Sequence, residues 1–434
     1  MTSAEGLRKN RKRYGRGYWE AREFLPTYDS WTLEEKQAYQ LERLRNFMQY
    51  ARDNSDFYRE RIPQDFIADL QSPSDLRSLP ILDKETLREN IDRVFTVDRK
   101  NATEGHTGGT TGKSLVVRST IPNSFERMAQ LDHFKSVIGF ENRKMRRASF
   151  TGKHIIPFRQ TSGPLWRLNR PTNQLLFSSL RLSPDNAKDY VAALNKYRPH
   201  ALDGFPSAMA ILARYMLQQN ITLEYQPIGL FPTAETLTAE LREVLETAFG
   251  APAYDQYASS EGAPFIYECP SRRLHIKLNS GVFEPGPDGN TLVTSFTTEG
   301  TPLIRYDIGD RVILDEQTRQ CECGIEEPLA LRIDGRAGDF LTRADGAHIY
   351  SGQTSNILKN VNNSIVEAQF RQDSTAKVTL LLVIDQIKWS DADLKQLNLD
   401  FTETMGPGVE LKLEFVSAIE RAPSGKHRLI VSNL

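Results

Sequence analysis

The chain has 434 residues, of which 39% are hydrophobic and 26% are charged, as in an ordinary globular protein of two or three domains. Its 55 basic and 56 acidic residues leave a formal net charge of −1, which argues against attraction to nucleic acid or to an acidic membrane. It lacks the apolar core of a signal peptide, and no stretch approaches the ~20 apolar residues of a membrane span. We therefore expect a cytoplasmic protein.

Predicted helices dominate the first part of the chain. Residues 7–22 are locally basic and have no apolar face directly after them, so we expect a solvated tail. Apolar residues recur at spacings of three and four within 33–61, which predicts a helix. Residues 72–90 contain two short helical starts with polar caps.

The middle of the chain alternates strand and helix. The apolar run 227–234 is typical of the end of a buried strand. Residues 207–220 and 236–250 have helical periodicity, and Gly250 closes the second of these helices.

The last part of the chain is richer in strands. From 265 to 334, short alternating runs are broken by turn sequences, which predicts β-structure. Residues 378–385, 390–406 and 410–416 then predict strand, helix and strand, a small α+β unit.

Residues 105–114, GHTGGTTGKS, could face a polyphosphate. They miss the P-loop spacing, because Thr107 stands where the first glycine should be. Glycine lets backbone N–H groups turn toward an anion, and the hydroxyls and the lysine are further donors. A plain glycine-rich hairpin turn is the alternative. The candidate phosphate-binding residues are Thr107, Gly108, Gly109, Thr110, Thr111, Gly112 and Lys113.

Four more stretches follow this loop in a characteristic order: YDQYASSEG at 254–262, PLIRYDIGD at 302–310, DGRAGDF at 334–340 and PSGKHRL at 423–429. With the loop, they resemble the motifs of the acyl-adenylate-forming ligases. The N-terminal stretches LERLRNFMQYARDNSDFYRERI and LPILDKETLREN are similar to the phenylacetate–CoA ligase and CapK branch of that superfamily. The resemblance covers about residues 33–430.

The resemblance implies an α/β fold with two domains. A large N-terminal adenylation domain, 1–335, would bind ATP and the acyl group, and a small mobile α+β domain, 336–434, would close over the cleft. The family's acidic hinge residue is replaced by Gly338, with Asp339 next, so the hinge's acidic character does not carry over.

The resemblance also assigns the nucleotide contacts. Tyr257 would stack on adenine, and Asp310 would accept both ribose hydroxyls, since one carboxylate has two oxygens suited to a vicinal diol. Glu261 would ligate Mg²⁺, a hard cation that prefers carboxylates. A solvated glutamate and a turn aspartate are the alternatives. The expected nucleotide-binding residues beyond the loop are Ala234, Glu235, Asp255, Tyr257, Ser259, Asp310 and Arg336.

The implied reaction has two halves. ATP and a carboxylic acid give acyl-AMP and pyrophosphate, and then a thiol such as CoA, or an amine, displaces AMP. Lys426 and Glu261 would be the catalytic residues, Lys426 stabilising charge at the α-phosphate. His154 and Phe205 would line the acyl pocket, with core packing as the alternative.

Rival functions and the oligomeric state stay open at this point. A catalytically inactive homologue that binds nucleotide or scaffolds a pathway is one rival. A true P-loop kinase is another, which the loop spacing disfavours. The protein is expected to be a monomer or a homodimer.

The three cysteines suggest a metal site. Cys269-x₅-His275 and Cys321-x-Cys323 together offer three thiolates and one imidazole, a Cys₃His set that suits a closed structural Zn²⁺ site. The odd number of cysteines argues against a disulfide framework. Three free or buried thiols are the alternative.

Overall fold

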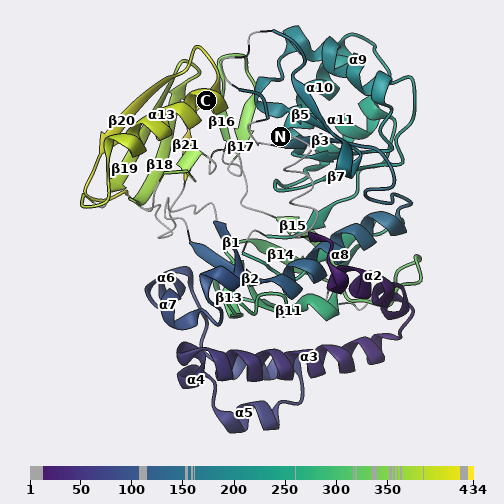
Figure 1. Ribbon diagram of the computed structural model, residues 1–434, viewed down its shortest axis with the longest axis vertical. Coiled ribbons are helices and arrows are strands. Elements are labelled where there is room, and N and C mark those ends of the chain that lie inside the picture. The colour runs from purple at the N-terminus through teal and green to yellow at the C-terminus, as the bar shows by residue number, and fades with distance from the viewer. Residues whose placement is uncertain are drawn as a thin grey trace.

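The computed structural model of the chain is shown in Figure 1. It describes residues 13–106, 115–151, 155–157, 160, 162–259, 261–315, 317, 320–334, 340–350, 354, 357–358, 360–361, 364–384, 386–420 and 429–434.

Short helices form the N-terminal layer of the molecule. The predicted helix over 33–61 is two helices, because Ser55 adopts an extended conformation and its hydroxyl accepts from the N–H of Tyr58, which caps a new helix. Thr32 and Glu35 form a capping box at the start of the longer one. The elements are α2 Arg16–Asp29, α3 Leu33–Asn54, α4 Asp56–Arg61, α5 Gln64–Asp69, η1 Pro73–Ser78, α6 Lys84–Glu89, α7 Ile91–Val94 and η2 Arg99–Asn101.

The expectation of a solvated tail over 7–22 is wrong for residues 16–22, which begin helix α2. Tyr18 and Leu25 of this helix are buried against helix α8. The hydroxyl of Tyr18 donates to Asp132 of α8 at 2.9 Å. Residues 7–12 lie outside the described part of the chain.

A hairpin flanks the glycine-rich segment 107–114, which itself lies outside the described residues. Strands β1 Ala102–His106 and β2 Val116–Thr120 pair antiparallel, so that His106 faces Val116. Helix α8, Ile121–Val137, follows β2 directly and starts at the N-cap Thr120. A strand, and not a helix, therefore comes after the glycine-rich segment, unlike in a P-loop.

A mixed sheet in the order β4-β5-β3-β6-β7 forms the α/β part, and β5, β3, β6 and β7 run parallel. Gly204 ends β6 at a φ of 137°, where a Cβ would lie 1.9 Å from the carbonyl oxygen of Phe150. The elements are β3 Arg147–Thr151, β4 Trp166–Asn169, η3 Arg170–Thr172, β5 Gln174–Ser178, η4 Ser179–Arg181, η5 Pro184–Asn186, α9 Ala187–Tyr197, β6 Ala201–Gly204, α10 Pro206–Gln218, β7 Gly229–Pro232 and α11 Ala239–Phe249. The predicted helices over 207–220 and 236–250 are confirmed, as is Gly250 as a left-handed C-cap.

The predicted β-region over 265–334 is also confirmed. It forms a five-stranded sheet, β14-β15-β10-β9-β8, and a three-stranded sheet, β11-β12-β13, whose apolar residues share one core with α3 and α4. We call these two sheets the β-layer. Its elements are β8 Gln256–Tyr257, β9 Ile266–Glu268, β10 Leu274–Ile276, η6 Leu278–Ser280, β11 Gly281–Pro285, η7 Pro287–Gly289, β12 Thr291–Ser295, β13 Leu303–Asp307, β14 Arg311–Leu314 and β15 Leu329–Asp334.

The C-terminal residues form an α+β unit with its own core, as predicted. Helix α13 packs Leu397, Phe401 and Met405 on a sheet of order β20-β19-β18-β21. The boundary predicted at 335/336 falls next to the undescribed residues 335–339 and stays a prediction. The elements are β16 Phe340–Thr342, β17 His348–Tyr350, β18 Ile365–Ser374, β19 Lys377–Ile384, α13 Asp391–Met405, β20 Glu410–Phe415 and β21 Ile430–Ser432.

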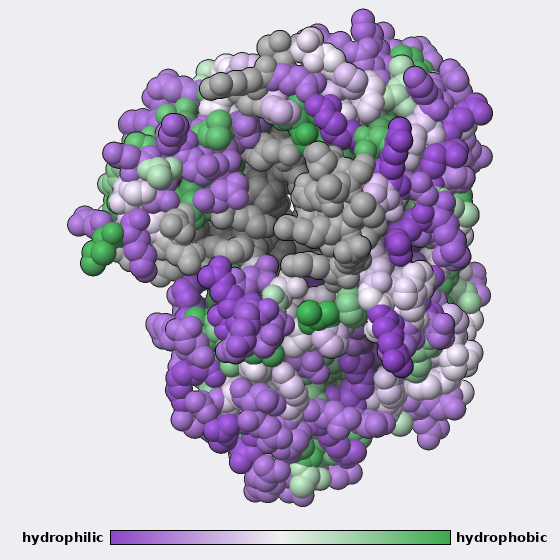
Figure 2. All heavy atoms as spheres, viewed as in Figure 1, coloured by the Kyte–Doolittle hydropathy of each residue, from purple (hydrophilic) through white to green (hydrophobic). Residues whose placement is uncertain are grey.

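Hydrophilic side chains cover most of the face shown in Figure 2, with apolar ones scattered among them. Among the described residues, no helix combines the length and the apolar character needed to cross a bilayer.

Candidate functional site

Two of the predicted nucleotide-binding residues meet in the β-layer. The hydroxyl of Tyr257, on β8, donates to Oδ2 of Asp310, which directly precedes β14, at 2.9 Å. In a flat sheet these outer strands would lie about 19 Å apart, four strand spacings of ~4.8 Å. The five-stranded sheet must therefore curl, and the curl brings the two motifs together. We call the Tyr257–Asp310 contact the nucleotide corner.

The loop after Tyr257 carries Glu261 and is held by helix α8. Arg127 of α8 donates to the carbonyl oxygen of Ser259 at 2.9 Å, and Oγ of Ser259 accepts from the N–H groups of Gly262 and Ala263. Burial lowers the pKa of Arg127, and the charge of Glu261 acts in the opposite direction. The partly exposed Glu261 thus lies in the electric field of a guanidinium that also fixes its loop.

Gly262 leaves room for this arginine. Its φ is 103°, and a Cβ at that position would lie 2.4 Å from Nη1 of Arg127 and 2.6 Å from Cγ2 of Thr298. Sequence reasoning missed Arg127, because an arginine within a helix carries no local signal that distinguishes a loop brace from a surface charge.

Further predicted residues gather at the carboxyl edge of the parallel strands, where open α/β sheets bind ligands. Ala234, after β7, is exposed and has a φ of 69°, which is unusual for a residue with a Cβ. Oε2 of Glu235 accepts from the N–H of Ser207, in the first turn of α10, at 3.1 Å. Burial raises the pKa of Glu235 to about 7, although hydrogen bonds from Ser207 lower it. Phe205, the N-cap residue of α10, is buried in the core that α9, α10 and α11 share.

Asp255 lies on the β8 side of the nucleotide corner. Its N–H donates to Glu268 at 2.7 Å, and its Oδ1 accepts from the N–H of Gln256 at 2.8 Å. Burial raises the pKa of Asp255 to about 7, against the hydrogen bond from Gln256. The side chain of Gln256 donates to the carbonyl oxygen of Pro232, which links β8 to the edge of the parallel sheet.

A pocket of about 280 Å³ lies between helix α10 and the β16–β17 hairpin of the C-terminal unit. Ser207, the hydrogen-bond partner of Glu235, and His348 both line it. The lining residues are Ser207, Ile211, Arg214, Leu241, Gly346, Ala347 and His348.

The remaining site predictions lie outside the described residues. They are Thr107, Gly108, Gly109, Thr110, Thr111, Gly112, Lys113, His154, Arg336 and Lys426.

The four predicted metal ligands come together in the β-layer. One ligand atom from each of Cys269, His275, Cys321 and Cys323 lies within 4.8 Å of all the others. The sulfurs of Cys269 and Cys321 are 3.5 Å apart, and that of Cys323 is 3.4 Å from Nε2 of His275. A disulfide would need about 2.05 Å. We call these four residues the Cys/His cluster.

Comparisons with known proteins agree with this architecture. The C-terminal domain of CapK matches residues 341–433. Protein CapK of Staphylococcus aureus is 34% identical over 100% of this chain and 96% of its own length. Phenylacetate-coenzyme A ligase of Thermus thermophilus is 26% identical over 77% of this chain and 78% of its own.

Among solved structures, 2-hydroxyisobutyryl-CoA ligase in complex with 2-HIB-AMP and CoA, in the thioesterification state, has a TM-score of 0.59. It covers 94% of this chain and 91% of that one at 18% identity, so it supports the fold. The full-length similarity to Protein CapK carries the assignment further. The chain belongs to the CapK-like branch of the AMP-forming, acyl-adenylate-forming ligases.

Proposed function

We propose that this protein adenylates a carboxylic acid with ATP and then transfers the acyl group to a thiol, such as that of CoA, or to an amine. The observation that carries the proposal is the hydrogen bond between Tyr257 and Asp310, two residues from separate motifs that converge at one corner. A tyrosine ring and a carboxylate at one corner offer a base-stacking surface and an acceptor for ribose hydroxyls.

Each residue has a proposed role that follows from the chemistry of its side chain. Asp310 accepts the ribose hydroxyls, while Tyr257 packs on the base and orients the Asp310 carboxylate. Ala234, Glu235, Asp255 and Ser259 line the adenine side, and Phe205 lines the acyl side. The glycine-rich segment 107–114 and Arg336 complete the phosphate and ribose contacts. Lys426 stabilises the charge that develops at the α-phosphate during acyl-AMP formation.

Mg²⁺ fits the residues present. Glu261 offers a hard carboxylate oxygen on the partly exposed loop that Arg127 braces, and carboxylates together with substrate phosphates are the usual ligands of this ion. When bound, Mg²⁺ neutralises phosphate charge. Glu261 holds it, and Arg127 keeps the loop of Glu261 in place.

The relatives differ in the group that accepts the acyl chain, so the family does not decide between a thiol and an amine acceptor. Some relatives are named for joining phenylacetate to coenzyme A, and one of Pseudomonas savastanoi, 22% identical over 54% of this chain, is named for joining indoleacetate to lysine, an amine. Both acceptor classes attack the same acyl-AMP, so the adenylation half-reaction is common to the two outcomes. His154 and Phe205 are our candidates for the wall that selects the acid.

We also propose a Zn²⁺ ion as a structural cofactor at the Cys/His cluster. Three thiols and an imidazole within 4.8 Å of one another match a closed Cys₃His site with no position left for a reacting water. This ion takes no part in adenylation.

Acid-dependent exchange of radiolabelled pyrophosphate into ATP tests the reaction. A panel of carboxylic acids, read out by hydroxamate trapping of the acyl-AMP, identifies the substrate class. Exchange with at least one acid is expected, and Asp310→Ala should abolish most of it. Binding of ATP without exchange for any acid would instead favour the inactive, nucleotide-binding scaffold.

A further inference from the structure

The loop that supplies two of the cluster's four cysteine and histidine ligands also contacts the N-terminal helices. Residues 320–328, all described, form no helix or strand of their own between β14 and β15. Within this loop, Cys321 and Cys323 belong to the Cys/His cluster. Glu326, three residues further on, accepts from the backbone N–H of Leu33 through Oε2 at 3.0 Å. The loop is therefore tied at one end to the cluster and at the other to the start of α3.

A lysine of α3 strengthens this second tie. Nζ of Lys36 donates to the carbonyl oxygen of Glu326 at 3.0 Å and to that of Asp29 at 3.1 Å. Lys36 is fully buried. A buried ammonium needs such acceptors, because leaving it unpaired would be costly. Lys36 thus joins the end of α2, the start of α3 and the loop.

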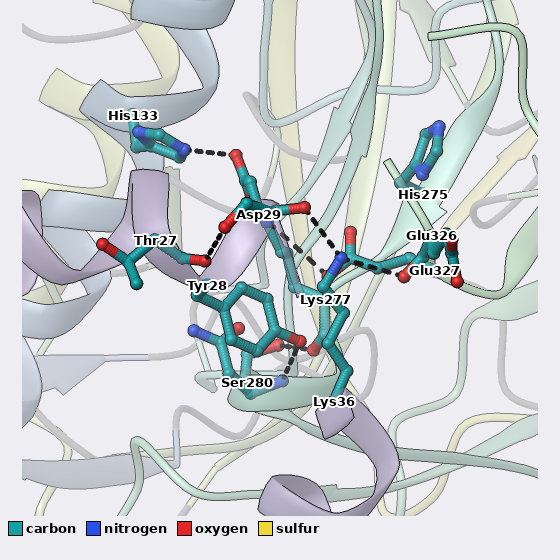
Figure 3. Close-up of polar contacts among 12 residues, drawn as sticks. Thr27, Tyr28, Asp29, Lys36, His133, His275, Lys277, Ser280, Glu326 and Glu327 are labelled. Carbon is teal, nitrogen blue, oxygen red and sulfur yellow. Dashed lines mark hydrogen bonds and ion pairs between the residues drawn. The ribbon is translucent and has the colours of Figure 1, made fainter. Parts of the chain in front are cut away.

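A second set of buried charges runs alongside, as Figure 3 shows. Lys277, two residues after the ligand His275, forms ion pairs with Asp29 at the end of α2 and with Glu327 of the loop, the latter at 3.5 Å. Asp29 also contacts Nε2 of His133, on α8, at 2.6 Å. These charged groups are nearly all buried, so separating any one of these chain segments from the others would leave a buried charge without its partner.

The hydroxyl of Tyr28, next to Asp29, accepts from the backbone N–H of Asn279 at 3.2 Å. The end of α2 therefore rests on the chain that follows His275, and the start of α3 rests on the chain that follows Cys323. Both contact regions begin within a few residues of a cluster ligand.

We propose that the Zn²⁺ ion at the Cys/His cluster is a fastener for the N-terminal helices α2 and α3, acting through the loop 320–328 and the strand β10. This inference rests on the structural Zn²⁺ of the proposed function. With Zn–S bonds of ~2.3 Å and a Zn–N bond of ~2.0–2.1 Å, a tetrahedral site has S···S edges of about 3.8 Å and S···N edges of about 3.6 Å. The observed 3.5 Å and 3.4 Å are close to these edges.

The physical reason is loop entropy. Without an ion, residues 320–327 belong to no helix or strand, so their conformational freedom opposes the order of the loop. Binding of the ion to the folded form stabilises that form alone, and its binding energy becomes folding energy for every contact made by the fixed loop. The hydrogen bonds from Leu33 and Lys36 to Glu326 belong to those contacts.

Elemental analysis and hydrogen–deuterium exchange of the full-length protein test the proposal together. We expect one zinc per chain. Removing it with a chelator, or substituting Cys321→Ser, should speed amide exchange about tenfold in 320–328 and in two further segments, 16–29 and 33–40. Helix α10 and strand β19, whose buried residues belong to two other hydrophobic cores, should exchange at an unchanged rate.

Lys36→Met is the matched second variant, because it leaves all four ligands in place. It should retain one zinc per chain and unchanged exchange at 320–324, while exchange at 33–40 rises. A zinc content near zero in the purified protein would overturn the proposal, and so would unaltered exchange at 16–40 after complete metal removal. Pyrophosphate exchange into ATP, measured on the same preparations, separates the two questions. One zinc per chain and slow amide exchange in the helices, without pyrophosphate exchange for any acid, would contradict the ligase function and still support the role of Zn²⁺ in holding the helices.

Discussion

The nucleotide corner and the Cys/His cluster are two convergence points in the same β-layer. Tyr257 and Asp310 are 53 residues apart in the sequence, and Cys269 and Cys321 are 52 apart. The cluster has four ligand atoms within 4.8 Å of one another. The corner brings together two residues, while Glu261, four residues after Tyr257, is partly exposed on a loop that Arg127 holds through the carbonyl oxygen of Ser259.

The two places differ in how much of the proposed site the described residues supply. A structural metal needs only protein ligands, so its site can be assembled fully by the topology of the strands. A substrate site must leave part of its hydrogen-bonding capacity for the substrate, and groups from other segments complete it. Under the proposed roles, nearly equal sequence separations lead to a closed metal site in one place and an open substrate site in the other.

The largest expected effect is on acyl-AMP formation, for which we propose that the C-terminal unit supplies Lys426 to the nucleotide site. Lys426→Ala should slow acyl-AMP formation by on the order of 10²–10³, the loss typical of one transition-state charge donor. Transfer from preformed acyl-AMP should change much less. Single-turnover assays of each half-reaction measure this, with Lys412→Ala, an exposed lysine of β20 paired with Glu414, as the control. Equal loss in both halves would contradict the assignment.

Asp310 tests whether the corner itself binds ribose. Asp310→Ala should weaken ATP binding by about 10–100-fold, because it removes a charged acceptor of two hydrogen bonds. Tyr257→Phe, which keeps the ring and loses only the hydroxyl that donates to Asp310, should cost less. Calorimetric titration with ATP measures both. If ATP affinity were unaltered in the Asp310 variant, the corner would have no role in ribose binding.

Arg127 sharpens the comparison, because it holds the loop after Tyr257 in place as the proposed Zn²⁺ ion would hold the Cys/His cluster. Arg127→Lys keeps the charge and loses the forked donor that holds the carbonyl oxygen of Ser259. We expect the Mg²⁺ concentration needed for half-maximal adenylation to rise about tenfold, with little change in the KM for the acid. An equal rise in both constants would point to general loosening of the fold.

The smallest expected effect is a pH dependence at the carboxyl edge. The pKa of Glu235 is about 7 in the folded protein and 4.5 in the reference state, so the folded form binds this proton more tightly. Its contribution to stability is present below pH 4.5 and is lost as the pH rises to 7. Glu235→Gln should therefore gain on the order of 1 kcal/mol relative to wild type between pH 5 and pH 8. Urea unfolding measures this, with exposed Glu243→Gln as control. A gain in stability that does not depend on pH would be evidence against a raised pKa of the Glu235 carboxyl.

Much of the fold could be predicted from local patterns. The helices α10 and α11 and the strand–helix–strand run of the C-terminal unit have strong periodicity, and Gly250 marks an end. The break at Ser55 could not be predicted, because the apolar spacing continues through it while a single capping hydroxyl restarts the helix. Helix α2 was missed because its buried face becomes apparent only with Asp132 and its neighbours on α8 in place.

For the candidate site, the sequence predicted the motifs but not the long-range contacts that hold them. The spacing and residue types around Tyr257, Asp310 and the four cluster residues are visible in the sequence, and the structure brings each set together. The curl of the five-stranded sheet and the brace from Arg127 are long-range features that no local pattern records. The roles of the individual site residues stay predictions until the variants above are measured.

The close approach of Gly262 and Arg127 has a consequence for how this sequence can diverge. A Cβ at 262 would overlap both Nη1 of Arg127 and Cγ2 of Thr298, and the φ of 103° disfavours any residue other than glycine, so alanine at 262 would strain the present loop even if the arginine moved. Removing the arginine alone would leave the Ser259 carbonyl oxygen without its donor. Relatives that keep arginine at 127 to hold this loop should therefore also keep glycine at 262, 135 residues further along the chain (262 − 127).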